Sequence, residues 1–149
     1  MKKTVLILLL AMLASGVHAY KKEVKGFGGL RWGDPQTKKF TLAYTDFVND
    51  AVIEVYVKDK EIPRVYDLEF ETLLFYFTNR RLTMVEFTCD LDTVLFEKAR
   101  KVLQQKHGRA TINTKKRLMW FGRKSHIGLA VNEGKGVVSL LFGEFIKDD

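Results

Sequence analysis

The stretch that decides the fold is LLFYFTNRRLTMVEFTCDLDTVLFEKARKVLQQKHG, residues 73–108. Its first half contains two runs, 73–78 and 82–88, that are rich in aromatic and β-branched side chains and are typical of strands. A short loop separates them, either 79–80 or 79–81, and Asn79 tolerates the left-handed backbone that tight turns need. The sequence therefore predicts a β-hairpin whose register depends on the loop length. A two-residue loop would mix the faces, whereas a three-residue loop would put the following apolar residues on one face: Leu73, Phe75, Phe77, Val85 and Phe87.

The second half predicts an amphipathic helix from about Asp92 to His107. Asp90 and Asp92 suit the N-terminal end of the helix, and Gly108 suits the position after its C-terminal end. One stripe of apolar residues repeats with the helical period: Leu91, Val94, Leu95, Ala99, Val102 and Leu103. Of these, Val94, Leu95, Val102 and Leu103 are expected to be buried against the sheet. The opposite side, with Glu97, Lys101 and Gln105, is expected to face water.

Further strands are expected on both sides of this stretch. Alternating or β-branched runs indicate strands near 40–44, at 51–57, at 117–121, at 126–131 and at 137–142. Asp34 and Pro35 are typical of a helix start, so a short helix is expected after Pro35. The sum predicts an α+β fold, with an antiparallel sheet of six to seven strands packed against one main helix, about 92–107.

The first nineteen residues have the pattern of a signal peptide. Lys2 and Lys3 precede an apolar run, 5–14, and small residues with Val17 and Ala19 at an A-x-A-like cleavage site follow it. The run is too short for a membrane span of about twenty residues. We expect export to the periplasm or the medium, and a mature chain, 20–149, that forms a single domain without a further transmembrane span.

Composition supports an ordinary folded domain. The chain has 149 residues, 46% hydrophobic and 29% charged, with only 2 prolines, which argues against disorder and fibrous classes. Loss of Lys2 and Lys3 lowers the formal charge from +7 to +5. The lone Cys89 cannot form an internal disulfide, and its place in an apolar run predicts that it is buried.

The opening of the mature chain resembles that of a group of small exported bacterial proteins of unknown function. These proteins begin F-x-G-hydrophobic-x-W-G, and the motif residues here are Phe27, Trp32, Gly33, Asp34 and Pro35. The likeness continues through the hairpin, the helix ending at Gly108 and the late Trp120. More loosely, the layout is similar to that of small outer-membrane-assembly lipoproteins and of beta-lactamase-inhibitor proteins, which bind other proteins. The resemblance implies export and an α+β fold, and it supplies no catalytic residue; we expect Phe27 and Trp32 to pack the chain start on the core.

No pattern for catalysis or for a cofactor is present. Ser125 and His126 are adjacent on an expected strand, so they point to opposite faces and make a poor dyad. Cys89, His107 and His126 lack the close spacing of metal ligands. The glycines of 26–33 do not match a phosphate-binding loop. We therefore expect no catalytic, cofactor or metal site, and a protein that is not an enzyme.

Positive charge is concentrated in one stretch of the chain. Residues 98–132 contain ten Lys or Arg side chains and no Asp or Glu, which favours an anionic partner or a basic, unengaged surface. Aromatic residues scarcely interleave with these charges, so nucleic acid is not expected. The candidate contact residues are Arg100, Lys106, Lys115, Lys116, Arg117, Arg123 and Lys124.

These observations favour an exported, non-enzymatic binding protein of the bacterial envelope that contacts another protein or an anionic surface component. The alternative is a carrier of an apolar small molecule or lipid, and a hydrolase is third. A continuous apolar cavity would favour the carrier, and a solid core with an exposed apolar or basic patch would favour the protein binder. A buried polar cluster would revive the hydrolase. The sequence does not identify the partner or the oligomeric state.

Export gives the first testable expectation. N-terminal sequencing of the exported protein should find its first residue at or near Tyr20, because cleavage follows the small residues that end at Ala19. A mature protein that retains residues 1–19 would contradict the assignment.

Overall fold

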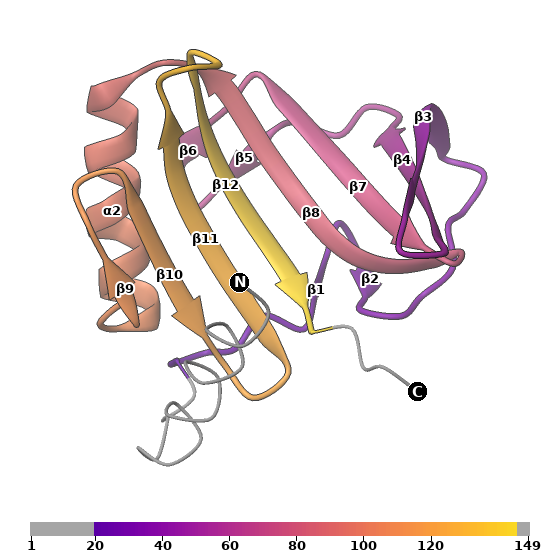
Figure 1. Ribbon diagram of the computed structural model, residues 1–149, viewed down its shortest axis with the longest axis horizontal. Coiled ribbons are helices and arrows are strands. Elements are labelled where there is room, and N and C mark those ends of the chain that lie inside the picture. The colour runs from indigo at the N-terminus through magenta and orange to yellow at the C-terminus, as the bar shows by residue number, and fades with distance from the viewer. Residues whose placement is uncertain (1–19, 146–149) are drawn as a thin grey trace.

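One antiparallel sheet of eight strands organises residues 20–145, which are the residues that the computed structural model describes (Figure 1). The signal peptide expected at 1–19 lies outside these residues. Across the sheet the strands are β3 (Phe40–Val48), β4 (Ala51–Lys58), β7 (Thr72–Thr78), β8 (Arg81–Asp90), β12 (Val137–Glu144), β11 (Ser125–Asn132), β10 (Arg117–Phe121) and β9 (Ile112–Asn113). Two small ribbons are separate from the sheet, β1 (Gly26–Phe27) with β2 (Leu30–Arg31), and β5 (Arg64–Val65) with β6 (Leu68–Glu69).

A single helix, α2 (Thr93–His107), connects the two halves of the sheet. The chain adds strands from the outer edge β3 to the centre at β8, crosses through α2 to the opposite edge at β9, and returns to the centre at β12. β12 then pairs with β8, so the two halves form one continuous sheet. The α+β class is confirmed, but the sheet has eight strands instead of six to seven, because β9 is only two residues long and has no sequence signature.

The hairpin of β7 and β8 combines a two-residue turn with a β-bulge. Asn79 and Arg80 both adopt left-handed conformations, with φ of 48° and 67°, so the tight turn is the one that Asn favours. The register then shifts by one residue between Tyr76 and Phe77, which leaves Thr83 as the extra residue of β8. This shift cancels the mixing of faces that a two-residue loop alone would cause. One apolar set is therefore buried on a single face: Leu73, Phe75, Phe77, Val85 and Phe87.

The prediction of a short helix after Pro35 is wrong, because residues 35–39 form no helix. Asp34 does not cap a helix, because its carboxylate accepts the backbone N–H of Arg31 at 2.9 Å. The backbone on either side of it pairs with β8 instead, since the N–H of Gly33 donates to the carbonyl of Leu82 and the N–H of Leu82 donates to the carbonyl of Asp34. Pro35 forms a β-bridge with Arg81.

The main helix has the expected limits and a rotated buried side. The Asp92 carboxylate accepts the N–H of Leu95 at 2.9 Å, and Gly108 ends the helix with a φ of 82°. The residues buried against the sheet are Phe96, Ala99, Leu103 and His107. Val94 was expected in the core, but its side chain is 78% exposed, so that prediction is wrong. Side chains two residues apart on a helix point to nearly opposite sides, and here Phe96 points to the core while Val94 points to solvent.

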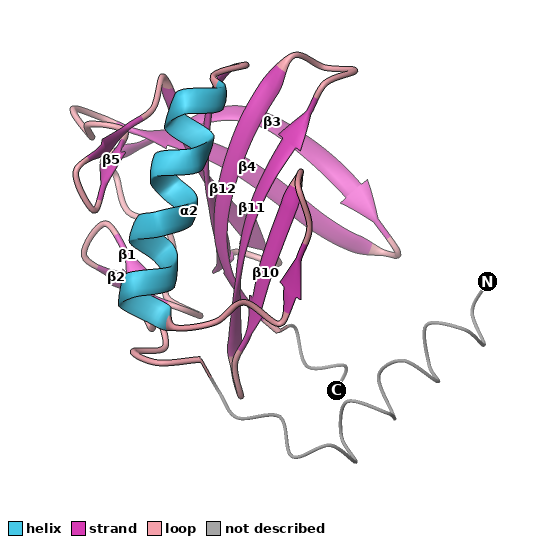
Figure 2. Ribbon diagram, turned by 90° about the vertical axis from the view of Figure 1, so that its left-hand side faces the viewer, coloured by secondary structure: helices cyan, strands magenta, loops and turns pink. Residues whose placement is uncertain are grey.

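The core fills the space between one face of the sheet and α2 with the two ribbons (Figure 2). Aromatic rings dominate it, with Phe27 of β1 packed edge-on against Phe87 at 5.1 Å and Phe40 against Phe75 at 5.0 Å. Cys89 is buried and forms no disulfide, as expected. Within residues 20–145, no helix has both the length and the apolar character required to cross a membrane.

The rotated helix gives a stability prediction. Leu103→Ala should lower the free energy of unfolding by about 2–5 kcal/mol, because the side chain is fully buried against the sheet. Val94→Ala should change it by less than about 0.5 kcal/mol, as exposed positions do. Urea unfolding of both variants measures the difference; equal losses would contradict the orientation of α2.

Candidate functional site

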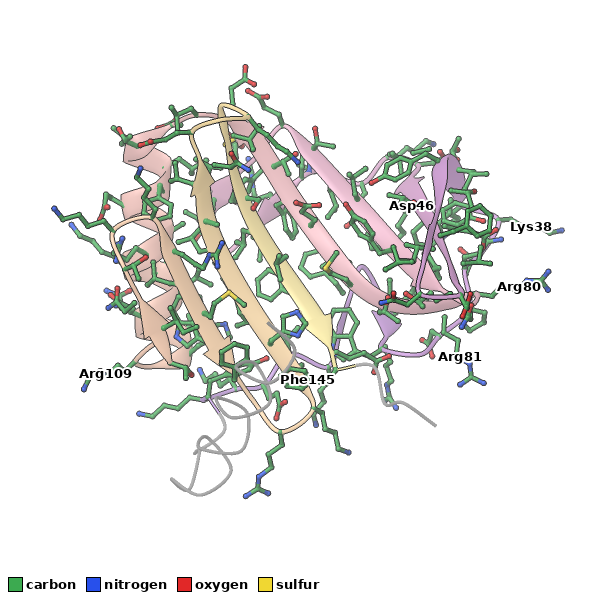
Figure 3. The ribbon with its side chains drawn as sticks, in the orientation of Figure 1. Lys38, Asp46, Arg80, Arg81, Arg109 and Phe145 are labelled. Carbon is green, nitrogen blue, oxygen red and sulfur yellow. The ribbon has the colours of Figure 1, made fainter. Side chains whose placement is uncertain are left out.

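The sheet has a second face that no described helix or ribbon covers. Figure 2 shows α2, β1, β2 and β5 on one side of the sheet, and Figure 3 views the opposite side, with Phe145 at its lower edge. We call this side the open face. It is formed by the side chains of six neighbouring strands, β4, β7, β8, β12, β11 and β10, that point away from the core.

The strand register places these outward residues in rows. One row crosses seven strands, from β10 to β3: Phe121, His126, Gly143, Met84, Tyr76, Val55 and Tyr44. The next row crosses five strands: Met119, Gly128, Leu141, Glu86 and Leu74. Most of these side chains are half-buried, and in these two rows they are mainly aromatic, aliphatic or thioether, where an antiparallel sheet ordinarily presents polar side chains to water. The row beyond them is mostly polar: Arg117, Ala130, Ser139, Thr88 and Thr72.

Charged side chains lie at the margins of the open face. Among the outward residues of its six strands, the charged ones are Arg81, Asp90, Arg117 and Glu86. Arg81 and Asp90 are the first and last residues of β8, and Arg117 is the first residue of β10. Glu86 is therefore the one charge among these residues that lies away from a strand end.

Glu86 is bound by Tyr76, which in turn lies beside Tyr44 of β3. The Tyr76 hydroxyl donates to the Glu86 carboxylate at 2.5 Å, and the Tyr44 hydroxyl lies 3.5 Å from that of Tyr76. Burial, followed by the hydrogen bond to Glu86, raises the pKa of Tyr76 well above its ordinary value. Val55, whose register neighbours are Tyr44 and Tyr76, is fully buried. At this end of the open face the hydrogen bond from Tyr76 holds the Glu86 carboxylate in place as a hydrogen-bond acceptor.

His126 lies at the other end of the open face, against Phe145. The two rings are 5.2 Å apart, and Phe145 also stacks with Phe121 at 6.3 Å. Gly143 makes room for the imidazole, because a Cβ atom there would lie 2.9 Å from Cε1 of His126. The buried Nδ1 has no hydrogen-bond partner among residues 20–145, and burial lowers the pKa of His126 below its ordinary 6.5. The ring is neutral at pH 7 and contributes apolar area.

The structure does not gather the candidate basic residues into one patch. The Arg100 guanidinium donates to Asn113 Oδ1 and to the carbonyls of Thr114 and Lys115, at 2.8, 3.0 and 3.0 Å. It therefore ties α2 to the loop before β10.

The other basic residues are either paired or dispersed. The Lys116 ammonium pairs with Glu133 at 2.7 Å, and that of Lys106 lies over the Tyr66 ring at 4.9 Å. Four exposed residues remain, with Lys115 and Arg117 at one end of the β10–β11 hairpin and Arg123 and Lys124 at the other.

The opening motif packs the chain start on the core. Phe27 contacts Phe87 and Phe142, and the indole of Trp32 donates to the carbonyl of Val24 at 2.8 Å. Gly33 has a φ of 88°, a conformation that glycine adopts without strain. These residues lie on the covered side of the sheet, away from the open face.

A polar cluster fastens the segment that follows the expected cleavage site. The Tyr20 hydroxyl lies 2.7 Å from Ser125 Oγ, and the Glu23 carboxylate accepts three hydrogen bonds, from the N–H of Lys124 and from the N–H and hydroxyl of Ser125. These bonds outweigh burial and lower the pKa of Glu23. Nearby, His107 bonds to the carbonyl of Lys21 and to the Tyr66 hydroxyl, both at 2.9 Å. Ser125 is fully buried and its hydroxyl is already hydrogen-bonded to Tyr20 and Glu23, so we call this cluster a structural clasp.

Features that would favour a carrier or an enzyme are weak in the described part of the chain. The surface hollows have volumes of about 240, 490 and 530 Å³ and lie around the β5–β6 ribbon and α2, where charged side chains form much of their lining. No cluster of three or more His, Cys, Asp or Glu side chains in residues 20–145 could hold a metal ion. Burial raises the pKa of the Cys89 thiol, which disfavours a reactive thiolate.

Comparisons of the chain with protein-family models, with curated proteins and with solved structures give no match. The resemblance of the opening motif therefore stays a hypothesis, and the function is argued from the open face.

The partly buried imidazole of His126 predicts a pH effect on stability. Because the pKa of His126 is lower in the folded protein than its ordinary 6.5, the unfolded chain takes up a proton first as the pH falls. The free energy of unfolding should decrease from about pH 6.5 downward, by at most about 1.4 kcal/mol per pH unit for one proton.

His126→Gln should make this acid-side decrease shallower without abolishing it, since burial also lowers the pKa of His107. Urea titrations at a series of pH values measure the slopes. Identical slopes for the wild type and His126→Gln would show that His126 is not held neutral by the fold.

Proposed function

We propose that the protein is an exported, non-enzymatic binding protein of the bacterial envelope that docks another protein on its open face. The observation that carries the proposal is the distribution of charge on that face. Apolar, aromatic and methionine side chains form its centre, and three of its four charges lie at strand ends. Protein interfaces have this anatomy, with a core depleted of charge and enriched in aromatic residues and Met, surrounded by a polar rim.

The shape of the surface also suits a macromolecule better than a small ligand. The open face follows the sheet across six strands, and small-molecule sites are concave and bury most of their ligand. Contiguous apolar side chains on a sheet face that no described element covers are typical of an interaction site. A protein surface is the partner class that covers such a face.

Glu86 specifies one feature of the partner. Tyr76 supplies one hydrogen bond to the carboxylate, which can accept several. A partner that covers Glu86 without a donor would leave a buried charge incompletely satisfied, at a cost of several kcal/mol. The proposed partner therefore presents an apolar patch with a Lys, Arg or hydroxyl donor near its centre.

Export is consistent with the clasp at the start of the described chain. Cleavage before Tyr20 would leave intact the contacts of Tyr20, Glu23 and Ser125 that fasten this segment. The dispersed basic residues contribute general positive charge, which favours approach to anionic envelope components without forming a defined site.

Capture from envelope extracts with matched variants tests the proposal. Met84→Lys and Met119→Lys introduce a charge into the centre of the open face, and Val94→Lys introduces the same charge on the exposed side of α2. Proteins that bind the immobilised wild type should bind the two methionine variants at least about tenfold more weakly, because an unpaired charge must be desolvated. They should bind Val94→Lys unchanged.

The same proteins retained equally on all three variants would contradict the proposal. A thermal unfolding scan of each variant confirms that the loss of binding is not a loss of folding.

A further inference from the structure

The two edge strands of the sheet, β9 and β3, differ in length and in what covers them. The β9 edge is two residues long, and Arg100 of α2 occupies its side by binding Asn113, Thr114 and Lys115. The β3 edge is nine residues long and lies at the end of the sheet farthest from the helix (Figure 1). β3 pairs only with β4 among the described strands.

Apart from one β-bulge, β3 lacks the features that protect an edge strand. Edge strands are ordinarily short, charged, interrupted by Pro or covered, because their free N–H and C=O groups pair readily with another strand. β3 contains no Pro and no Lys, and Asp46 is its one charged residue. After Phe40 every residue of β3 is exposed, including four large apolar side chains: Leu42, Tyr44, Phe47 and Val48, at 49%, 48%, 73% and 45%.

The charges that flank β3 are complementary to a reversed copy of the same strand. Lys38 and Lys39 precede it, whereas Asp46 and Asp50 lie in and after its second half. All four side chains are exposed, and Figure 3 shows Lys38 pointing away from the body of the protein at this end of the sheet. In an antiparallel pair of two such strands, the basic start of each strand lies beside the acidic end of the other.

We propose that β3 pairs with β3 of a second copy of this chain, antiparallel and about a two-fold axis near Tyr44. Tyr44 is the middle residue of the strand, so pairing near it overlaps most of the strand in each copy. A slip that centres the pair on Asp46 would oppose two carboxylates and is disfavoured. The bulge between Leu42 and Tyr44 shifts the alternation of the β3 side chains by one residue, so inward residues of the two copies meet when the axis falls between two residues beside Tyr44.

The pairing has a consequence for the open face. Two antiparallel strands joined about an axis perpendicular to the sheet keep the same face on the same side. The dimer is therefore one continuous sixteen-stranded sheet, twice the eight strands of one copy, with both open faces on one side. This inference depends on the geometry of β3 and not on the identity of any envelope partner.

Sedimentation equilibrium of the exported protein, alone and over a range of concentrations, tests the proposal. The wild type should associate to twice the monomer mass. Lys38→Glu/Lys39→Glu and Asp50→Lys should each weaken the dimer about tenfold, since each places like charges together at two symmetric sites. The combination of all three substitutions should restore it. Lys98→Glu, an equal reversal on an exposed part of α2, should have no effect.

A cross-link tests the register directly. Tyr44→Cys should form a disulfide-linked dimer under mild oxidation, because Tyr44 lies beside the axis and facing Cα atoms of an antiparallel pair are about 4.5–5.5 Å apart, within reach of a disulfide. Ile62→Cys, exposed on a loop away from β3, should not. A monomeric wild type, a combined variant that is not restored, or equal cross-linking at both positions would overturn the proposal.

Discussion

The register of the β7–β8 hairpin determines which side chains face the helix and which lie on the open face. Because side chains alternate along a strand, a slip by one residue would exchange the two sets. The left-handed turn at Asn79 and Arg80 starts the pairing, and the bulge at Thr83 corrects it, so that Phe75, Phe77 and Val85 all enter the core. β4 pairs with β7 and β12 with β8, so their alternation follows from this one register.

The same register explains why one sheet has two apolar faces. Leu74, Tyr76 and Met84 alternate with core residues and are themselves apolar, so correct burial of one set places the other set on the open face. A helix or a second sheet usually covers such a face, and none of the described elements does so here. The apolar side that no described element covers and the long β3 edge are the two features on which we base our proposals, and we propose a different partner for each.

Local patterns predicted the elements well, and long-range packing accounts for the failures. Period and capping residues identified α2 and its ends, and alternation identified β4 and β10–β12. The bulge at Thr83 and the two-residue β9 leave no local signal, and Pro35 pairs with β8 instead of starting a helix because Asp34 binds backward to Arg31. The sequence analysis did not predict the open face, because its residues, such as Met84, Met119 and Leu141, come from separate strands. A signal was present, however, in runs such as 73–77 and 137–142, which are apolar at almost every position and are therefore typical of strands buried on both faces.

Methionine oxidation in the native envelope tests the central claim most directly. Met84 and Met119 are the only methionines of the mature chain expected from cleavage before Tyr20, and both lie on the open face. A covered open face predicts that brief oxidation modifies both in the purified protein and neither in intact envelopes, while a Val94→Met reference on α2 is modified in both. Equal oxidation of Met84 and Met119 in the envelope and in the purified protein would contradict the account.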